Sequence, residues 1–250
     1  MNAASSRNAG PALTVPPPNT SVLRLGGLTP LSLTDFPGRL AAVVFCQGCP
    51  WSCVYCHNPH LIPADAPPER DWASVLDFLG RRGGLLDAVV FSGGEPTLQV
   101  GLAGAMADVR RRGFQVGLHT AGPYPERLAE VLPLVDWVGF DVKAPFERYD
   151  SISRVPGSGE KARESLRLVI ESGVDHECRT TSHPSLITAP QLSALSERLF
   201  AMGARRHVLQ SFRAAGCRDE GLNAAGGEVA VISLLERACA LEPRAERRVA

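Results

Sequence analysis

Residues 88–97 have the sequence Ala-Val-Val-Phe-Ser-Gly-Gly-Glu-Pro-Thr, in which an apolar run gives way to two glycines. The run Ala88–Phe91 is typical of a buried β-strand, and the segment Leu98–Arg112 then follows with helical period. A strand, a glycine turn and a helix in this order make one unit of an α/β protein. The fold therefore depends on how many such units the chain contains.

Six strand–helix units alternate along the sequence. The expected strands are Ala41–Phe45, Ala88–Phe91, Phe114–His119, Trp137–Asp141, His176–Thr181 and His207–Ser211. The expected helices are Arg70–Arg82, Leu98–Arg112, Pro125–Leu132, Lys161–Ser172, Ala189–Met202 and Glu228–Leu241. Strict alternation implies a parallel sheet. Because a closed TIM barrel has eight units, six predict an open, partial (β/α)6 barrel or a doubly wound sheet, with the functional site at the carboxyl ends of the strands.

Composition and the chain ends bound the class of protein. Residues 1–21 are small and polar and lack the apolar core of a secretory signal, so we expect a disordered tail before one domain over 22–242. We expect residues 243–250 to form a flexible C-terminal tail. Lys+Arg 26 equals Asp+Glu 26, which disfavours a general nucleic-acid binder. The apolar run Leu40–Cys46 is far shorter than the ~20 residues of a membrane span. The sequence predicts a cytoplasmic protein.

Seven cysteines are distributed unevenly, with four of them between positions 46 and 56. An odd number crowded into one segment argues against a disulfide framework and favours metal ligands or redox groups. Cys49, Cys53 and Cys56 have the spacing C-x3-C-x2-C, which allows three thiols on one loop to converge. Three thiols on an iron–sulfur cluster leave one iron open. With Cys46 as a fourth ligand, the site is instead a closed zinc or electron-transfer centre, and spacing alone leaves both open.

The turn after the second expected strand is a second candidate site. Gly93 and Gly94 allow a ligand to approach the backbone closely, and Glu95 is an acceptor suited to an ammonium group. A Gly-Gly pair alone is also typical of a tight turn. Its position at a strand end, beside the cysteine segment, favours a functional role.

The two segments together resemble those of radical S-adenosylmethionine (SAM) enzymes. The string from Gln47 to Asn58 is similar to that of the activating enzymes of glycyl-radical proteins. The segments 36–38, 91–97 and 137–145 resemble those of the activating proteins of anaerobic ribonucleoside-triphosphate reductase. The resemblance covers about 23–212 and favours the three-thiol interpretation.

The resemblance implies a 4Fe-4S cluster on Cys49, Cys53 and Cys56, whose open iron chelates SAM. One-electron reduction then releases a 5′-deoxyadenosyl radical, which abstracts a hydrogen atom from a glycine of a partner enzyme. The remaining implied contacts are to parts of SAM. Tyr55, His57 and Asn58 line the adenine, Gly93, Gly94 and Glu95 hold the ammonium, Asp141 and Lys143 contact the ribose or carboxylate, and Arg179 and Thr120 lie nearby.

Some of these positions have simpler explanations. Asp141 and Lys143 also fit a strand-end ion pair, and Arg179 suits bidentate binding of a carboxylate but could point to a rim. His119 stands before Thr120 where many relatives have an aspartate that helps to hold a monovalent cation, and imidazole is no substitute at a hard cation. The other cysteines and histidines have no ligand spacing and are expected to be ordinary side chains: Cys178, Cys217, Cys239, His60, His176, His183 and His207.

The sequence therefore predicts an oxygen-sensitive radical SAM activase. Its expected partners are a glycyl radical enzyme, foremost anaerobic ribonucleotide reductase, and a flavodoxin or ferredoxin type electron donor. One alternative is a radical enzyme acting on pyruvate formate-lyase or on a small molecule such as a deazapurine. Another is a four-Cys zinc or electron-transfer protein.

Overall fold

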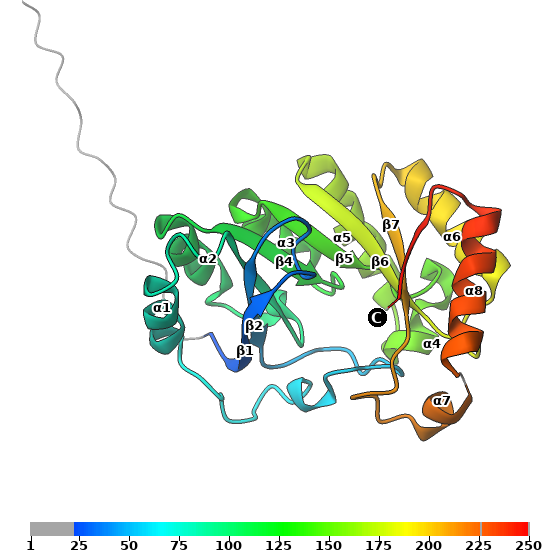
Figure 1. The fold of residues 1–250 in the computed structure, drawn as a ribbon, viewed down its shortest axis with the longest axis horizontal. Coiled ribbons are helices and arrows are strands. Elements are labelled where there is room, and N and C mark those ends of the chain that lie inside the picture. Colours follow the sequence, from blue (N-terminus) through cyan, green and yellow to red (C-terminus); the bar gives the residue numbers. More distant parts are fainter. Residues whose placement is uncertain (1–22, 226, 250) are drawn as a thin grey trace, which may run out of the picture.

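A computed structural model describes residues 23–225 and 227–249, and its centre is one eight-stranded sheet whose strands follow one another in chain order (Figure 1). The strands are β1 Leu25–Ser32, β2 Ala41–Cys46, β3 Ala88–Gly93, β4 Gln115–Thr120, β5 Trp137–Asp141, β6 Asp175–Ser182, β7 His207–Ser211 and β8 Glu246–Arg248. Neighbouring strands from β2 to β8 are parallel, and β1 is antiparallel to β2. The predicted α/β fold with six central parallel strands is confirmed.

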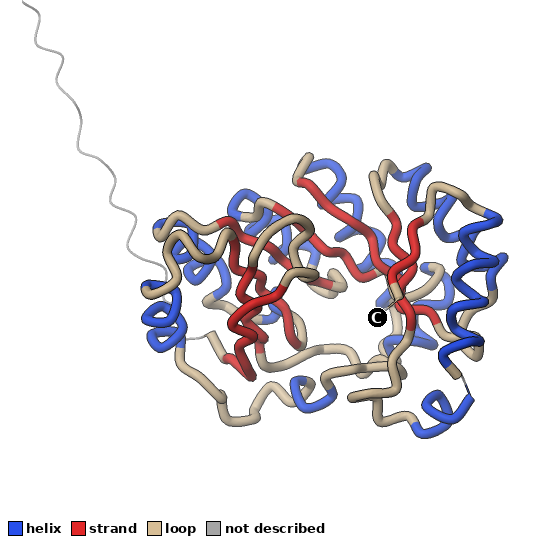
Figure 2. The backbone as a smooth tube through the Cα atoms, in the orientation of Figure 1, coloured by secondary structure: helices blue, strands red, loops and turns tan. Residues whose placement is uncertain are grey.

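Helices cover the outside of this curved sheet (Figure 2). The α-helices are α1 Trp72–Gly80, α2 Leu102–Arg111, α3 Pro125–Val131, α4 Tyr149–Ser153, α5 Ser158–Ser172, α6 Ala189–Met202, α7 Glu220–Ala225 and α8 Glu228–Leu241. Short 3-10 turns are η2 Pro59–Leu61, η3 Pro96–Leu98, η4 Leu132–Leu134 and η5 Phe146–Arg148. Helix α6 has the bounds expected from its sequence, because Gln191 accepts from the Thr188 N–H at 2.9 Å and Gly203 ends it at φ 104. In the described part of the chain, no helix is long and apolar enough to cross a membrane.

The two edges of the sheet make the barrel partial. Strand β1 pairs with β2 and strand β8 pairs with β7, but no pairing joins β1 to β8 among the residues that the structure describes. Residues 246–248 differ from the expected flexible tail, because Val208 lies in register with Glu246 and the Arg248 guanidinium holds the buried Glu177 carboxylate at 2.9 and 3.1 Å. This strand has no apolar alternation, so its sequence alone did not indicate it. The expected tail over 1–21 lies outside the described residues.

Two layers of apolar packing hold the barrel together. Residues of the outer layer fill the space between sheet and helices, for example Val44, Phe91 and Leu118. Inside the barrel, Phe36 from the β1–β2 loop stacks on Trp137 with ring centroids 5.3 Å apart. Phe36 therefore closes the amino-terminal end of the barrel, which leaves the carboxyl ends of the strands open for a site.

Candidate active site at the carboxyl ends of the strands

A cavity of about 270 Å³ opens at the carboxyl ends of the strands. The structure brings every site residue expected from the sequence to its wall. These are Cys49, Cys53, Tyr55, Cys56, His57, Asn58, Gly93, Gly94, Glu95, Thr120, Asp141, Lys143 and Arg179. Five strand ends, from β3 to β7, and the loop after β2 contribute to this wall, so residues 130 positions apart in sequence share one space.

The loop at residues 47–58, called the Cys loop below, is fixed by backbone hydrogen bonds. The Gly48 N–H donates to Leu61 O at 2.8 Å, and the Cys49 N–H donates to Ile62 O at 3.1 Å. The Gln47 side chain donates to His60 O at 3.1 Å and to Pro63 O at 2.7 Å. These contacts give the first thiol a defined position although the segment contains no helix or strand.

Two thiols of the Cys loop, those of Cys49 and Cys53, are desolvated. Burial raises the pKa of Cys49 to about 12, with smaller effects of Glu95 and Cys53, and burial also raises the pKa of Cys53. Cys46 differs from these, because it lies within β2, is fully buried in the core and does not line the cavity. Burial raises its pKa as well.

The Gly-Gly-Glu turn packs directly against the Cys loop. The Gly94 N–H donates to Cys46 O and the Glu95 N–H donates to Gly48 O, each at 2.9 Å. A Cβ on Gly94 would lie 2.2 Å from Gly48 O, so only glycine fits there. The turn and the loop therefore form one rigid unit.

The Glu95 carboxylate is buried and organises the same unit. Its Oε1 accepts from the Thr97 N–H, the Thr97 hydroxyl and the Thr120 hydroxyl at 3.1, 2.6 and 2.7 Å. Its Oε2 accepts from the Ala121 N–H at 3.1 Å. Burial raises the pKa of Glu95 against these four donors. The carboxylate thus joins the ends of β3 and β4.

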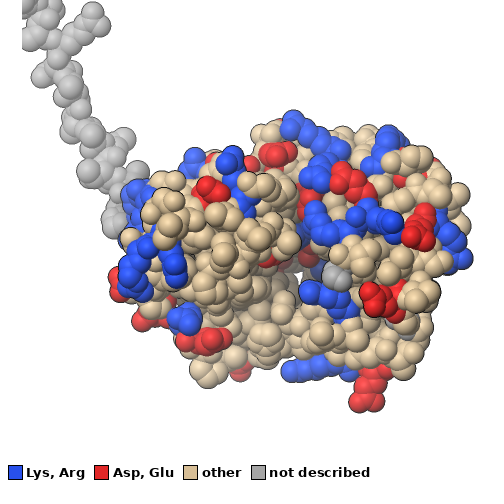
Figure 3. Space-filling view, in the orientation of Figure 1, with Lys and Arg blue, Asp and Glu red and all other residues tan. Residues whose placement is uncertain are grey.

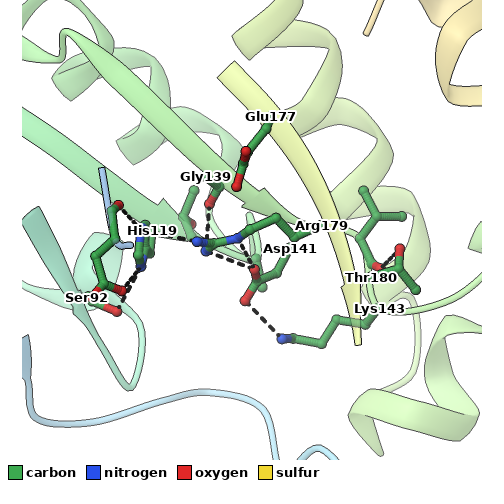
Figure 4. Close-up of polar contacts among 12 residues, drawn as sticks. Ser92, His119, Gly139, Asp141, Lys143, Glu177, Arg179 and Thr180 are labelled. Carbon is green, nitrogen blue, oxygen red and sulfur yellow. Dashed lines mark hydrogen bonds and ion pairs between the residues drawn. The ribbon is translucent and has the colours of Figure 1, made fainter. Parts of the chain in front are cut away.

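A charged network lies at the ends of β5 and β6 (Figure 4). The Asp141 carboxylate accepts from Arg179 Nε at 3.0 Å and from Lys143 Nζ at 3.3 Å, which is the ion pair that the sequence allowed. Burial opposes the charge, but Lys143 and then Arg179 lower the pKa of Asp141 to about 2. Arg179 also donates to Gly139 O at 3.2 Å and is 8% exposed, so its guanidinium points into the barrel and not to a rim. Asp141 stays ionised there.

His119 lies between this network and the β1–β2 loop. Its Nε2 is 3.1 Å from Arg179 Nη1 and 2.8 Å from Asp35 O, and its Nδ1 is 3.3 Å from Ser92 Oγ. Burial and then Arg179 lower the pKa of His119 to about 4, so the imidazole is neutral near pH 7. Arg179 thus places a fixed positive charge beside the His119 ring.

The far end of the Cys loop holds a histidine with an unused polar atom. His57 Nε2 is buried and has no hydrogen-bond partner in the described part of the chain, although its ring lines the cavity. The Tyr55 hydroxyl donates to Lys143 O at 3.3 Å, which ties the loop to the end of β5. A ligand in the cavity would supply the partner that His57 lacks.

Several wall residues were not expected from the sequence. They are Asp35, Trp51, Ser92, Ala121, Thr181, Gln210 and Arg213. Thr181, Gln210 and Arg213 lie at or just beyond the ends of β6 and β7, so the strand-end rule already applied to the other strands would have found them. Asp35 reaches the cavity through a loop, and no local signal indicates that path.

The sequence of the chain matches a known protein family. The model of the Radical SAM superfamily matches residues 43–187, which is more than half of the chain. The chain belongs to the radical SAM superfamily, a class of enzymes that uses a 4Fe-4S cluster and SAM.

Individual relatives resemble the chain at moderate identity. "Putative glycyl-radical enzyme activating enzyme MJ1227" of Methanocaldococcus jannaschii is 29% identical over 205 residues, which are 78% of this chain and 82% of that one. The pyruvate formate-lyase-activating enzyme of Clostridium pasteurianum is 29% identical over 60% of this chain and 63% of its own length. The 7-carboxy-7-deazaguanine synthase of Thermococcus kodakarensis is 29% identical over 54% of this chain and 61% of its own length. The match thus spans less than two thirds of the latter two relatives.

A solved structure supports the fold. QueE from Escherichia coli superimposes with a TM-score of 0.57 at 18% identity, over 91% of this chain and 94% of that one. At this identity the likeness concerns the fold alone. It confirms the partial barrel of the radical SAM type.

Proposed function

We propose that the chain is a radical SAM activase that generates a glycyl radical on a partner enzyme. The observation that carries the proposal is the shared cavity, in which the three thiols of C-x3-C-x2-C face the Gly-Gly-Glu turn and the Asp141 network. The match to MJ1227 over 78% of the chain supports the activase class among radical SAM enzymes. The finer assignment to anaerobic ribonucleoside-triphosphate reductase rests on the resemblance of segments 36–38, 91–97 and 137–145.

The residues of the cavity fit the two cofactors. Cys49, Cys53 and Cys56 would hold a 4Fe-4S cluster, because thiolates are the usual ligands of such clusters. The backbone of the Gly-Gly-Glu turn would hold the SAM ammonium, and His57 with Tyr55 and Asn58 would line the adenine. The buried, unpartnered Nε2 of His57 fits a hydrogen bond to the adenine. Glu95 itself would act through the turn that it organises, since its oxygens already accept four hydrogen bonds.

A cluster held by these thiols would supply, when reduced, the one electron that splits SAM into methionine and a 5′-deoxyadenosyl radical. The chain's own residues orient the reactants. Asp141 is a fixed anion that can accept from ribose hydroxyls, and Lys143 and Arg179 hold positive charge next to the carboxylate of the methionine moiety. His119 stays neutral beside them, so it adds hydrogen bonding without a third positive charge.

The geometry disfavours a four-Cys zinc site. A zinc ion needs every ligand within about 2.3 Å of one point. Cys46 faces the core and is not on the cavity wall. Three thiols around a cavity suit a cluster, which spaces its ligands around its own body.

A small-molecule substrate is the second candidate. The similarity to the 7-carboxy-7-deazaguanine synthase of Thermococcus kodakarensis, over 54% of this chain, favours it. A small-molecule enzyme turns over without a protein partner. An activase leaves a stable glycyl radical on its target, visible by electron paramagnetic resonance.

Anaerobic reconstitution tests the proposal. We expect about four irons and four sulfides per chain, and cleavage of SAM to 5′-deoxyadenosine with dithionite. Cys53→Ala should abolish this cleavage, whereas the matched control Cys46→Ser should keep both the cluster and SAM binding. Retained cleavage in Cys53→Ala, or loss of the metal in Cys46→Ser, would refute the site assignment.

A further inference from the structure

The Cys loop has an outer face as well as the face toward the barrel. A separate cavity of about 240 Å³ lies against it, called the outer cavity below, and Cys53 and Cys56 line both this cavity and the one inside the barrel mouth. These two thiols therefore form a thin wall between the proposed SAM site and the surface. Two arginines, Arg154 and Arg218, also line the outer cavity.

Arg154 occupies a strained backbone position. With φ 60 and ψ 25 it is the one non-glycine residue at positive φ in the described part of the chain. It ends helix α4, where glycine is the usual residue because a side chain is disfavoured in this conformation. Strain of this kind persists where the surroundings impose it, and it is often found at functional positions.

Helix α4 is bound directly to the Cys loop. The Ser52 N–H donates to Ser153 O at 3.1 Å, and the Val54 N–H donates to Ile152 O at 3.0 Å. These carbonyls belong to the last turn of α4, where the helix itself offers no partners. Arg154 follows immediately, so its position relative to Cys53 is fixed.

Arg218 reaches the outer cavity from a different part of the chain. The Cys217 thiol donates to Val54 O at 3.8 Å, and a Cβ on Gly216 would lie 2.3 Å from His57 O. The segment before α7 therefore packs tightly on the Cys loop. Figure 1 shows this segment, in brown, near the cyan loop at the lower side of the barrel.

The two arginines give the wall of the outer cavity more positive than negative charge. Neither guanidinium has a hydrogen bond or an ion pair with the residues that the structure describes, and both arginines are exposed. Asp219 is the acidic residue on the wall of the outer cavity, and its carboxylate accepts from the Leu222 N–H at 3.0 Å at the start of α7. Elsewhere basic and acidic side chains are interspersed, as one face of the molecule shows (Figure 3). With formal net charge +0, the chain has no overall charge to steer a partner, so local charge must do so.

We propose that this outer face is the docking surface of an acidic one-electron donor protein, which reduces the cluster through the side of Cys53 and Cys56. The inference rests on the proposed function, because it requires a cluster on these thiols. One electron leaves the donor, which is oxidised, and enters the cluster, which is reduced; no proton or group is transferred. Because electron transfer slows steeply with distance, the donor must bind where the ligands are nearest to the surface. The glycyl partner can then use the open side of the barrel at the same time.

A charge-reversed double variant tests the surface. The variant carries Arg154→Glu and Arg218→Glu. Its control carries Arg39→Glu and Arg81→Glu, the same change in net charge at exposed arginines near the opposite ends of the strands. The probe is a flavodoxin of acidic surface. The affinity of oxidised flavodoxin for the cluster-loaded chain is measured by calorimetry without SAM. The rate at which reduced flavodoxin reduces the cluster is measured by the bleaching of the cluster's visible absorbance.

We expect the first variant to bind flavodoxin at least tenfold more weakly and to be reduced at least tenfold more slowly at low salt. Added salt should slow reduction of the wild-type chain and of the control, and have little effect on the variant. Reduction by dithionite and dithionite-driven SAM cleavage should be equal in all three. Equal flavodoxin binding in the variant and its control would overturn the proposal.

A second variant covers the case in which charge reversal impairs cluster uptake. Arg154→Gly with Arg218→Gln removes both charges and relieves the backbone at position 154. We expect it to take up the cluster normally and still bind flavodoxin at least threefold more weakly, and unchanged binding would overturn the docking surface. Failure of the wild-type chain to cleave SAM with dithionite would instead refute the proposed function, so the two failures are distinguishable.

Discussion

Two carboxylates that line the same cavity behave in opposite ways. Glu95 is 2% exposed and accepts four hydrogen bonds from neutral hydroxyl and N–H groups. Asp141 accepts from two cationic side chains, Arg179 and Lys143. The pKa of Glu95 is raised by burial, whereas Lys143 and Arg179 overcome burial and lower the pKa of Asp141 to about 2.

The difference teaches which surroundings keep a carboxylate charged. Neutral donors orient the buried Glu95 carboxylate but leave part of its desolvation cost, whereas opposite charges and the 34% exposure of the Asp141 side chain offset that cost. Glu95 is therefore suited to a structural role in the turn, and Asp141 to presenting a permanent negative charge to a ligand. The variants below separate these two roles by stability and by its pH dependence.

The largest loss of stability is expected for Glu95→Ala. The substitution leaves the donors of Thr97, Thr120 and Ala121 buried without an acceptor, and each such group costs about 1–3 kcal/mol. We expect the free energy of unfolding to fall by at least about 3 kcal/mol in urea titrations. Glu95→Gln keeps one acceptor oxygen and is the matched control, with a loss of about 1–2 kcal/mol. Equal stabilities of the two variants would contradict the structural role.

A smaller effect is expected at His207, a buried group that likewise has only neutral partners. Its ring nitrogens lie 2.9 Å from Thr180 Oγ1 and 2.8 Å from Ser196 Oγ, and burial lowers its pKa to about 3. The unfolded chain binds a proton at this residue below about pH 6.5 and the folded chain does not, so the wild-type chain loses roughly 2 kcal/mol between pH 7 and pH 5. In urea titrations, the free energy of unfolding of His207→Gln should fall between pH 7 and pH 5 by roughly 2 kcal/mol less than that of the wild-type chain.

The control for this pH dependence of stability is His60→Gln, which removes an exposed imidazole on η2. It should lose stability with falling pH as steeply as the wild-type chain does. If His207→Gln shows that same slope, the imidazole at 207 is not held neutral by burial.

The sequence predicted the regular part of the fold from local pattern. Strands β5 and β7 and helices α6 and α8 have the expected bounds, because their apolar residues recur with the right period. Strand β1 was not expected, since Gly26, Gly27 and Pro30 disfavour a strand; the antiparallel edge position tolerates them, and Pro30 needs no ladder partner there. Strand β8 depends on β7 and on Glu177, which are distant in sequence.

In the candidate site, too, local sequence predicted some features, whereas others depend on residues distant in sequence. The thiols, the Gly-Gly-Glu turn and Asp141 lie at strand ends, where the topology of a parallel sheet brings residues together. Partner choice could not be predicted in this way. The sequence left open whether Arg179 faces a ligand carboxylate or a rim; in the structure its Nε is bonded to Asp141 and its Nη1 faces His119, contacts that depend on three separate strands.

The smallest effect is expected for Asp141→Asn, because the Asp141 side chain is 34% exposed and water screens its ion pairs. Its folded-state pKa of about 2 lies below the ordinary value of about 3.9, so its charge stabilises the fold above pH 4 and this contribution is lost as pH falls toward 2. We expect Asp141→Asn to be about 1 kcal/mol less stable than the wild-type chain at pH 5, with a difference that shrinks toward pH 3. Asp65→Asn, at an exposed loop position, should show no such trend. A difference that stays constant from pH 5 to pH 3 would mean that Asp141 contributes shape and hydrogen bonds rather than charge, and the contrast with Glu95 would then be one of geometry alone.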